Sequence, residues 1–399
     1  MSFKDDSLEY HNSMQCEPTQ NESSKSLILD AYSLRVYVRI TAQTNSRKIF
    51  AHRKVTVLRI EMEPNSDVEA ILSKGLSRSG ITREEALRLM EIDVHSPEMY
   101  SLYFVADRMT RQQFHNMGEV HAQIGIDYSP CSKRCKFCVF GTIAEKRVQF
   151  DVNEVVARAK IFQASGANAI YLMTTDGYDF DEFLNIGKQV KASLSPRMPM
   201  VANIGDFGPS EAESLAEAGF TAIYHAVRLR EGRDTTIDPD VRVRTIKSAQ
   251  NVGLSALFCL EPVGPEHTAE EMVDLMFLGK DLGVSLHGAM RRVSAEGMPL
   301  HHHGDITSPS LAKAVAVCRL VMGDSLLAHC THEPNLPSLL AGANLLWAEA
   351  GPNPRDAEVD TSTQRGRGLS VEECRRMLWE AGFETLTGPS PCTRKRDVS

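Results

Sequence analysis

The chain has 399 residues, of which 42% are hydrophobic and 24% charged, and its formal net charge is −8. This composition is typical of an ordinary globular protein, and the acidic balance argues against nucleic acid as a partner. No apolar run is long enough to span a membrane, and the polar N-terminus lacks the apolar stretch of a secretory signal, so we expect no membrane partner. Nine cysteines without a paired framework suit a reducing compartment, so we expect a cytoplasmic protein.

Residues 1–65 are predicted to be a poorly ordered segment or a small β extension. Residues 1–26 are rich in Ser, Asn, Glu and Asp, which favours disorder. Residues 27–40 and 49–62 contain short alternating runs, VYVRI and VTVLRIEM, that predict a hairpin. Residues 66–120 then show helical periodicity. In ITREEALRLMEI, Thr82 and Glu85 have the spacing of a capping box.

The next stretch, HAQIGIDYSPCSKRCKFCVFGT, begins as an alternating apolar strand and continues into a loop with three cysteines. Cys131, Cys135 and Cys138 have C-x3-C-x2-C spacing, which random placement would give only about 0.005 times. Three thiolates can hold three irons of a [4Fe–4S] cluster and leave the fourth without a protein ligand. The alternative is a zinc knuckle or a redox CxxC pair, with His121 or another distant residue as fourth ligand. Such sites favour paired CxxC units, and no second pair occurs.

With Phe137 before its third cysteine, this loop resembles the signature of the radical S-adenosylmethionine (radical SAM) superfamily. The resemblance implies two cofactors, a [4Fe–4S] cluster and SAM, whose amino and carboxylate groups chelate the open iron. One electron from the cluster then cleaves SAM to methionine and a 5′-deoxyadenosyl radical. The implied partners are a small-molecule substrate and an electron donor such as a flavodoxin or ferredoxin.

Strand and helix signals alternate through residues 121–350, which predicts a (β/α)8 barrel with its active site at the C-terminal strand ends. Asp151 and Glu154 form a second capping pair, and glycines 166, 219 and 253 suit the residue that follows a helix. The eight strands are expected near residues 122–127, 169–173, 199–204, 221–226, 254–260, 284–293, 326–330 and 343–348. The fold class is therefore a TIM-type α/β barrel with an N-terminal helical extension and a C-terminal helix.

Residues 351–399 are predicted to contain a loop, a helix that begins with a Ser370–Glu373 capping box, and a flexible basic tail. Within the superfamily, the resemblance is closest to the group of biotin synthase, [FeFe]-hydrogenase maturase and methylornithine synthase. GANLLWAEAGPNPRD (342–356) resembles the last strand and loop of biotin synthase, and RRVSAEGMPL (291–300) its sixth strand. The resemblance also implies N-terminal helices that close the barrel bottom.

The resemblance places SAM-binding groups at the ends of the second and third strands. Thr174, Thr175 and Asp176 occur in MTTDGYDF, where the superfamily has a turn that receives the SAM amino group, with an ordinary βα loop as the alternative. Asn203 ends the third strand. Arg242 lies eleven residues before the helix-ending glycine, as does the family's SAM-carboxylate arginine. Neighbouring Arg244 is the alternative.

Polar residues also follow the later strands. The fourth strand ends in YHAVRLREGR, where Arg228, Arg230 and Glu231 are candidates for SAM or substrate contacts. Arg291 and Arg292, on the sixth strand, are candidates for the same kind of contact. Substrate contacts are further expected in LLAHCTHEPN, from His329, His332 or Glu333. The run of histidines 301–303 is not expected to bind one metal, because neighbouring side chains diverge.

One departure from biotin synthase bears on the reaction. That enzyme uses further barrel cysteines and an arginine to hold a second, sulfur-donating cluster, whereas the corresponding positions here are Leu172, Val201 or Ala202, and Cys259. We therefore expect a mutase, lyase or cofactor-maturation reaction on a small amino-acid-like or cofactor-precursor substrate, with biotin synthase-like sulfur insertion as the alternative. From another class, a non-catalytic iron–sulfur or zinc binding protein is also considered.

Overall fold

A computed structural model describes residues 24–31, 34–42, 53–62, 66–332, 334–356 and 368–395. The chain divides into two compact units between Glu69 and Ala70. Several parts of the chain lie outside the described residues. They are most of residues 1–26, which were predicted to be disordered, Glu333, part of the loop after residue 356, and the last four residues. The predicted domain limits stay predictions.

The first unit contains an antiparallel sheet in the order β1-β2-β3. A two-stranded hairpin was predicted here, and that prediction was one strand short. Residues 27–40 contain parts of two strands, and Ala31 pairs with Leu34. The strands are β1 (Ser24–Ala31), β2 (Leu34–Ala42) and β3 (Arg53–Met62).

The second unit contains a closed barrel of eight parallel strand positions, which confirms the predicted fold class. β4 pairs with β7 on one side and with β14 on the other, and a pairing of β10 with β12 completes the ring. β10 and β11 follow each other in one strand position. The strands are β4 (Met117–Gly125), β7 (Ala169–Met173), β8 (Met200–Asn203), β9 (Ala222–Tyr224), β10 (Ser255–Leu257), β11 (Leu260–Val263), β12 (Leu286–Arg291), β13 (Ala328–His332) and β14 (Leu345–Ala350).

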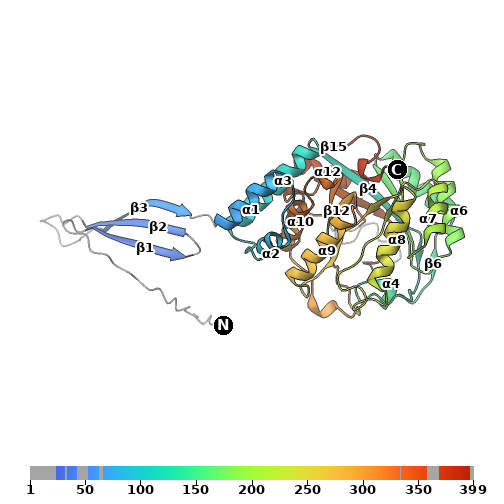
Figure 1. The fold of residues 1–399 in the computed structure, drawn as a ribbon, viewed down its shortest axis with the longest axis horizontal. Helices are drawn as coiled ribbons and strands as arrows, with labels where there is room; N and C mark the ends of the chain where they lie inside the picture. The colour runs from blue at the N-terminus through green and yellow to red at the C-terminus, as the bar shows by residue number, and fades with distance from the viewer. Residues whose placement is uncertain are drawn as a thin grey trace, which may run out of the picture. The chain divides into compact units, whose positions relative to one another are not determined.

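Helices follow the strands and surround them, as Figure 1 shows for α6, α7, α8 and α9. The capping boxes predicted at Thr82, Asp151 and Ser370 are all present. The predicted helix-ending glycines have positive φ angles of 91°, 95° and 81°, which favour glycine. The barrel helices are α5 (Val152–Ala164), α6 (Phe180–Ser193), α7 (Pro209–Glu217), α8 (Pro239–Asn251), α9 (Ala269–Asp281), α10 (Ser308–Met322) and α11 (Leu336–Leu340).

Segments from both ends of the second unit meet the N-terminal ends of the barrel strands. In α3, Thr110 Oγ1 donates to Gly342 O (2.6 Å) and Gln113 Nε2 to Leu326 O (2.7 Å), next to where β14 and β13 begin. The short helix η3 (Pro391–Thr393) packs against β10. The barrel bottom is thus bordered by an N-terminal helix, as expected, and also by the C-terminal segment. The flanking elements are α1 (Ser66–Leu76), α2 (Arg83–Met90), α3 (Pro97–Gln113), α12 (Val371–Glu380) and β15 (Glu384–Thr385).

Aromatic rings form a layer across the barrel interior. The Trp347 ring meets Tyr171 at 6.1 Å and Tyr224 at 6.3 Å, both edge to face, and His332 stacks on it at 4.9 Å. Below these rings lie small apolar side chains together with Cys259 and Cys330. The layer separates the lower core from the upper mouth, where the C-terminal strand ends meet.

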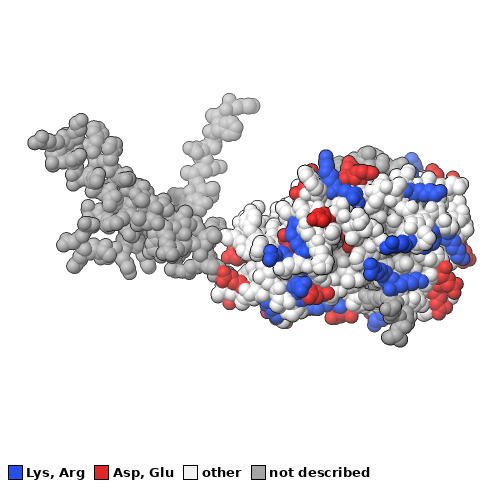
Figure 2. Space-filling model, turned by 90° about the horizontal axis from the view of Figure 1, so that it is seen from above, with Lys and Arg blue, Asp and Glu red and all other residues white. Residues whose placement is uncertain are grey.

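The surface of the second unit carries charges of both signs. On the face in Figure 2, lysine and arginine side chains lie in small groups among aspartates and glutamates, without one broad patch of a single sign among the described residues. Within the same described ranges, every helix is too short or too polar to cross a membrane.

Candidate functional site

The cysteine loop leaves the top of β4 and is held in shape by its own backbone. Cys131 N donates to Phe140 O (2.7 Å) and Cys138 N to Cys135 O (3.0 Å). The loop ends in the short helix α4 (Val139–Thr142). A Cβ on Gly141 would lie 2.7 Å from Cys135 N, so only glycine fits there. The three thiols are thereby fixed beside one another at the barrel mouth.

All three cysteines line one cavity at the C-terminal strand ends, together with Phe137. Among the described residues that line it, they are the only cysteines. Burial raises the pKa of the Cys135 thiol to about 11 and that of Cys138 to about 12, so both are protonated near neutral pH until a metal replaces the proton. Three thiols without a fourth fit a cluster with one open iron better than a closed zinc site.

The predicted turn after β7 reaches the same cavity. Thr175 donates twice to the Asp127 carboxylate, from its backbone N (2.7 Å) and from Oγ1 (2.6 Å). Asp176 pairs with Lys133 of the cysteine loop at 3.4 Å. Thr174 Oγ1 is buried and has no hydrogen-bond partner among the described residues. The turn is therefore fixed in place and presents an unsatisfied hydroxyl.

Arg242 also lines the cavity, and only 5% of its surface is exposed. Its Nη1 donates to Asp206 Oδ1 (3.2 Å), and its Nε lies 3.6 Å from Glu231 Oε2 but has no hydrogen-bond partner among the described residues. Burial lowers the pKa of Arg242, helped by the charge of Arg228. Arg244, the alternative, is exposed on the opposite face of α8.

The three candidates after β9 separate in the structure. Arg228 lines the cavity and pairs with Glu261 at 3.5 Å. Arg230 does not line it, because its Nε donates to Glu271 on α9 (2.7 Å). Glu231 lies behind the cavity wall, where it accepts hydrogen bonds from Arg228 N (2.9 Å) and Thr235 Oγ1 (2.7 Å).

A polar network on neighbouring strands was missed in the sequence. Gln123 accepts from Asn203 Nδ2 (3.0 Å) and donates to Glu349 Oε1 (3.2 Å). Arg355 Nη2 donates to both Glu349 oxygens (2.6 and 2.7 Å), and His332 lies 3.4 Å from the same carboxylate. Burial alone would raise the pKa of Glu349, but Arg355 and His332 hold it well below its usual range. The sequence feature that could have predicted this network is Glu349, a glutamate inside the otherwise apolar strand LLWAEA.

The remaining candidates take different places. Arg291 and Arg292 both line the cavity, and Arg292 pairs with Glu266 at 3.0 Å. His329 is fully buried and faces α10, with Nε2 3.0 Å from Val315 O. Residues 301–303 form an exposed 3-10 turn, and Glu333 lies outside the described residues. The zinc alternative that used His121 finds no support, because this side chain does not line the cavity.

Fold and site together define an α/β-barrel enzyme with a three-cysteine metal loop and a polar cavity at the C-terminal strand ends. The sequence profile of the radical SAM superfamily matches residues 128–279, from just before the cysteine loop into α9. The chain belongs to this superfamily, and its cofactors are accordingly a [4Fe–4S] cluster and SAM.

The similar proteins are distant. The chain is 24% identical over 328 residues to biotin synthase of Clostridioides difficile, covering 78% of this chain and 97% of that one. Biotin synthase of Desulforudis audaxviator is 28% identical, over 60% of this chain and 75% of its own. Among solved structures, methylornithine synthase (PylB) has a TM-score of 0.68 at 17% identity, covering 79% and 97% of the two chains. The [FeFe]-hydrogenase maturase HydG has the same TM-score at 15% identity, covering 81% and 76%. These two structures support the barrel fold.

Proposed function

We propose that Cys131, Cys135 and Cys138 hold the cluster and that SAM binds in the adjoining cavity, where the chain acts on a small substrate. When bound, the cluster and SAM would supply a 5′-deoxyadenosyl radical, and an external reductant such as a flavodoxin or ferredoxin would supply the electron. The observation that carries this proposal is that one cavity is lined by the three thiols and by polar groups from the ends of most barrel strands. A module that only binds metal would have no use for this wall of polar groups.

Within this proposal, the SAM amino group binds at the turn of Thr174 to Asp176, and the SAM carboxylate binds Arg242. The turn offers a buried hydroxyl without a partner, and Arg242 offers an Nε without one among the described residues. A guanidinium can donate two parallel hydrogen bonds to a carboxylate. Asp206 and Glu231 hold Arg242 in place, and the arginine lines the cavity.

For the substrate we propose an amino-acid-like molecule or a cofactor precursor that carries a carboxylate. Arg291 lines the cavity, and among the described residues no carboxylate pairs with it; its Nη1 donates to Ile306 O at 3.3 Å. A substrate carboxylate would complete that pairing. Arg228 and Glu261 pair on the same wall and offer both charges to a zwitterion. The reaction would then be a rearrangement, a cleavage or a step of cofactor maturation.

Biotin synthase-like sulfur insertion is the less favoured alternative. Its second cluster needs thiolates in the cavity, yet Leu172, Val201 and Ala202 are apolar and do not line the cavity. Cys259 is fully buried, lies 3.1 Å from Cys330 in the lower core and does not line the cavity. We predict about four irons per reconstituted chain. Iron analysis that gives clearly more, with the surplus lost in Cys259→Ala, would favour sulfur insertion instead.

A direct assay tests the proposed activity. The chain is reconstituted anaerobically with iron and sulfide, reduced and given SAM, and 5′-deoxyadenosine is then measured by mass spectrometry. We expect its formation to depend on the cluster and to increase with the right substrate. Candidate amino acids labelled with deuterium should identify that substrate by transfer of label to 5′-deoxyadenosine. No 5′-deoxyadenosine from a fully loaded cluster would contradict the proposal.

Arg242→Lys is predicted to weaken SAM binding about 10- to 100-fold, which corresponds to about 1.5–3 kcal/mol for one charge-assisted pair. Lysine keeps the charge but loses the planar fork. The measurement is a SAM titration of the cluster-loaded protein. Arg244→Lys is the matched control, because this side chain is exposed two positions along the same helix. Weaker binding by the Arg244 variant alone would show that the assignment is wrong.

A further inference from the structure

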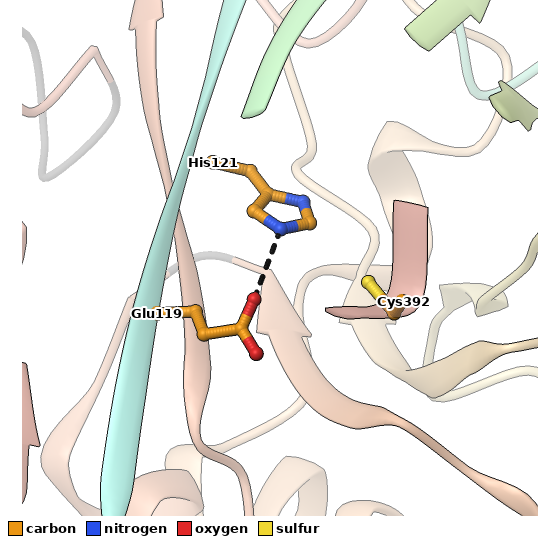
Figure 3. Close-up of side chains that lie close together, drawn as sticks. All are labelled: Glu119, His121 and Cys392. Carbon is orange, nitrogen blue, oxygen red and sulfur yellow. Dashed lines mark ion pairs between the residues drawn. The ribbon is translucent and has the colours of Figure 1, made fainter. Parts of the chain in front are cut away.

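A second group of metal-binding side chains lies at the opposite end of the barrel from the cysteine loop. Glu119 and His121 are two residues apart on β4, so both point into the barrel. Cys392 approaches them from η3, near the C-terminus (Figure 3). The carboxylate, imidazole and thiol ligand atoms all lie within 4.8 Å of one another.

This cluster is buried and has unmet bonding capacity. Glu119 is 3% exposed, and His121 and Cys392 are fully buried. Glu119 Oε2 and His121 Nε2 have no hydrogen-bond partner among the described residues, although they face each other at 3.4 Å. Most buried polar atoms in proteins have a hydrogen-bond partner, so this facing pair is open to a further group such as a cation or a water molecule.

The other ring nitrogen of His121 is already used. Its Nδ1 lies 2.7 Å from Tyr171 Oη, a hydrogen bond that fixes the ring. If Nδ1 carries the proton, the Nε2 lone pair points at Glu119. Two electron-rich atoms then face each other, and a cation between them would satisfy both. Metal-binding histidines are commonly oriented by such a bond from their second nitrogen.

The geometry points to a mononuclear Zn²⁺ site formed by Glu119, His121 and Cys392. One oxygen, one nitrogen and one sulfur are ligands that zinc accepts together. Zn–N and Zn–O bonds of about 2.0–2.2 Å at a tetrahedral angle place the two donors about 3.4 Å apart. The Oε2 to Nε2 distance is 3.4 Å. The Cys392 sulfur would need to move inward by about 1.4 Å at most.

Charge supports a divalent ion. A glutamate carboxylate and a cysteine thiolate together carry two negative charges, so Zn²⁺ would give a neutral site, with the thiol proton released to solvent. A neutral site suits this apolar surrounding, because a lone buried charge is costly. Within the described ranges, His121 is the one ion-pair partner of Glu119.

The site would tie the end of the chain to the first barrel strand. Around it, Ser285 Oγ donates to Cys392 O (2.7 Å), Ser255 Oγ to Arg394 O (2.5 Å) and Ser390 N to Asn168 O (2.9 Å). These bonds fasten the C-terminal segment beneath the barrel. Three protein ligands would leave the fourth tetrahedral position of the ion to a water molecule. We assign the ion a role in holding the C-terminal segment, because the aromatic layer separates it from the cavity with the cysteine loop.

Zinc content tests the proposal. The full chain, with its [4Fe–4S] cluster reconstituted, is equilibrated with ZnCl2, desalted and analysed for zinc and iron separately. The same is done with Cys131, Cys135 and Cys138 changed to alanine, so that the cluster loop cannot hold the zinc. We expect about one zinc per chain in both proteins. It should be lost in Glu119→Gln, which keeps the side-chain shape, and in Cys392→Ala, but kept in Cys374→Ala, a buried thiol outside the group.

A spectroscopic measurement covers the case in which a variant folds poorly. Co²⁺ added to the chain without the cluster cysteines should give the near-ultraviolet band of a thiolate–cobalt bond, and excess Zn²⁺ should remove it. If the protein without the cluster cysteines bound no stoichiometric zinc and showed no such band, the proposal would be overturned. Glu119 and His121 would then be a buried Glu–His pair only. Zinc retained by folded Glu119→Gln and Cys392→Ala proteins would overturn it as well.

Discussion

Changing Cys131, Cys135 and Cys138 together to alanine is expected to abolish 5′-deoxyadenosine formation and to reduce bound iron to background. Each thiol would supply one iron ligand, and all three line the cavity from a loop whose backbone is held by its own hydrogen bonds. Alanine removes the ligand and leaves the loop backbone in place. The measurements are iron and sulfide content, the visible absorption of the cluster, and turnover of SAM.

The matched control is Cys374→Ala. This thiol is fully buried in α12 and donates to Trp347 O (3.3 Å), away from the cysteine loop. It should keep its iron and its activity. If the triple variant still held four irons after reconstitution, the assignment of the cluster loop would be wrong.

Arg355→Met should destabilise the folded barrel by about 3–5 kcal/mol, because it leaves a buried carboxylate without its closest cation. Glu349 is 6% exposed, and Arg355 Nη2 donates to both of its oxygens. Urea unfolding at neutral pH measures the change. Arg376→Met is the control, since this arginine is 75% exposed and its contact with Glu380 is worth little.

The double variant Arg355→Met with Glu349→Gln should recover part of the loss, because the glutamine carries no charge.

The same pair should also make the stability of the fold depend on pH. The pKa of Glu349 is lower in the folded protein than in the unfolded chain. The Glu349–Arg355 pair therefore stabilises the fold fully above the ordinary pKa of glutamate, and this stabilisation is lost as the pH falls toward the lower pKa of the folded protein. Without Arg355, burial raises that pKa, so lowering the pH should destabilise the single variant less than the wild type. Equal stability of wild type and Arg355→Met at neutral pH would contradict this account.

The order of the elements could be predicted because it depends on local patterns. Capping boxes at Thr82, Asp151 and Ser370 are set by residues three positions apart, and β7 was predicted at the residues where it occurs. Alternation of strands and helices then leaves few topologies besides a parallel barrel. The first sheet was predicted one strand short, because residues 27–40, interpreted as one alternating run, contain parts of both β1 and β2.

The site was only partly visible in the sequence. The cysteine spacing is local, so the chemistry of the loop could be predicted from it, and the superfamily and its cofactors are confirmed. The SAM contacts stay predictions. Of those residues, the structure brings Arg242 and Arg228 into the cavity and turns Arg230 toward Glu271. Arg230 has a φ angle of 58°, and the direction of a side chain at such a turn cannot be counted from strand alternation.

By itself, the sequence determined the barrel, the three-cysteine loop and the ends of the helices, since each follows from spacings of a few residues. Only the tertiary structure decided which distant groups meet. Arg355 reaches Glu349 across a loop, and Cys392 reaches Glu119 from 273 positions further along the chain (392 − 119). Barrel closure decides these meetings, because it brings strands and terminal segments together irrespective of their separation in the sequence, and burial then fixes their charges and hydrogen bonds.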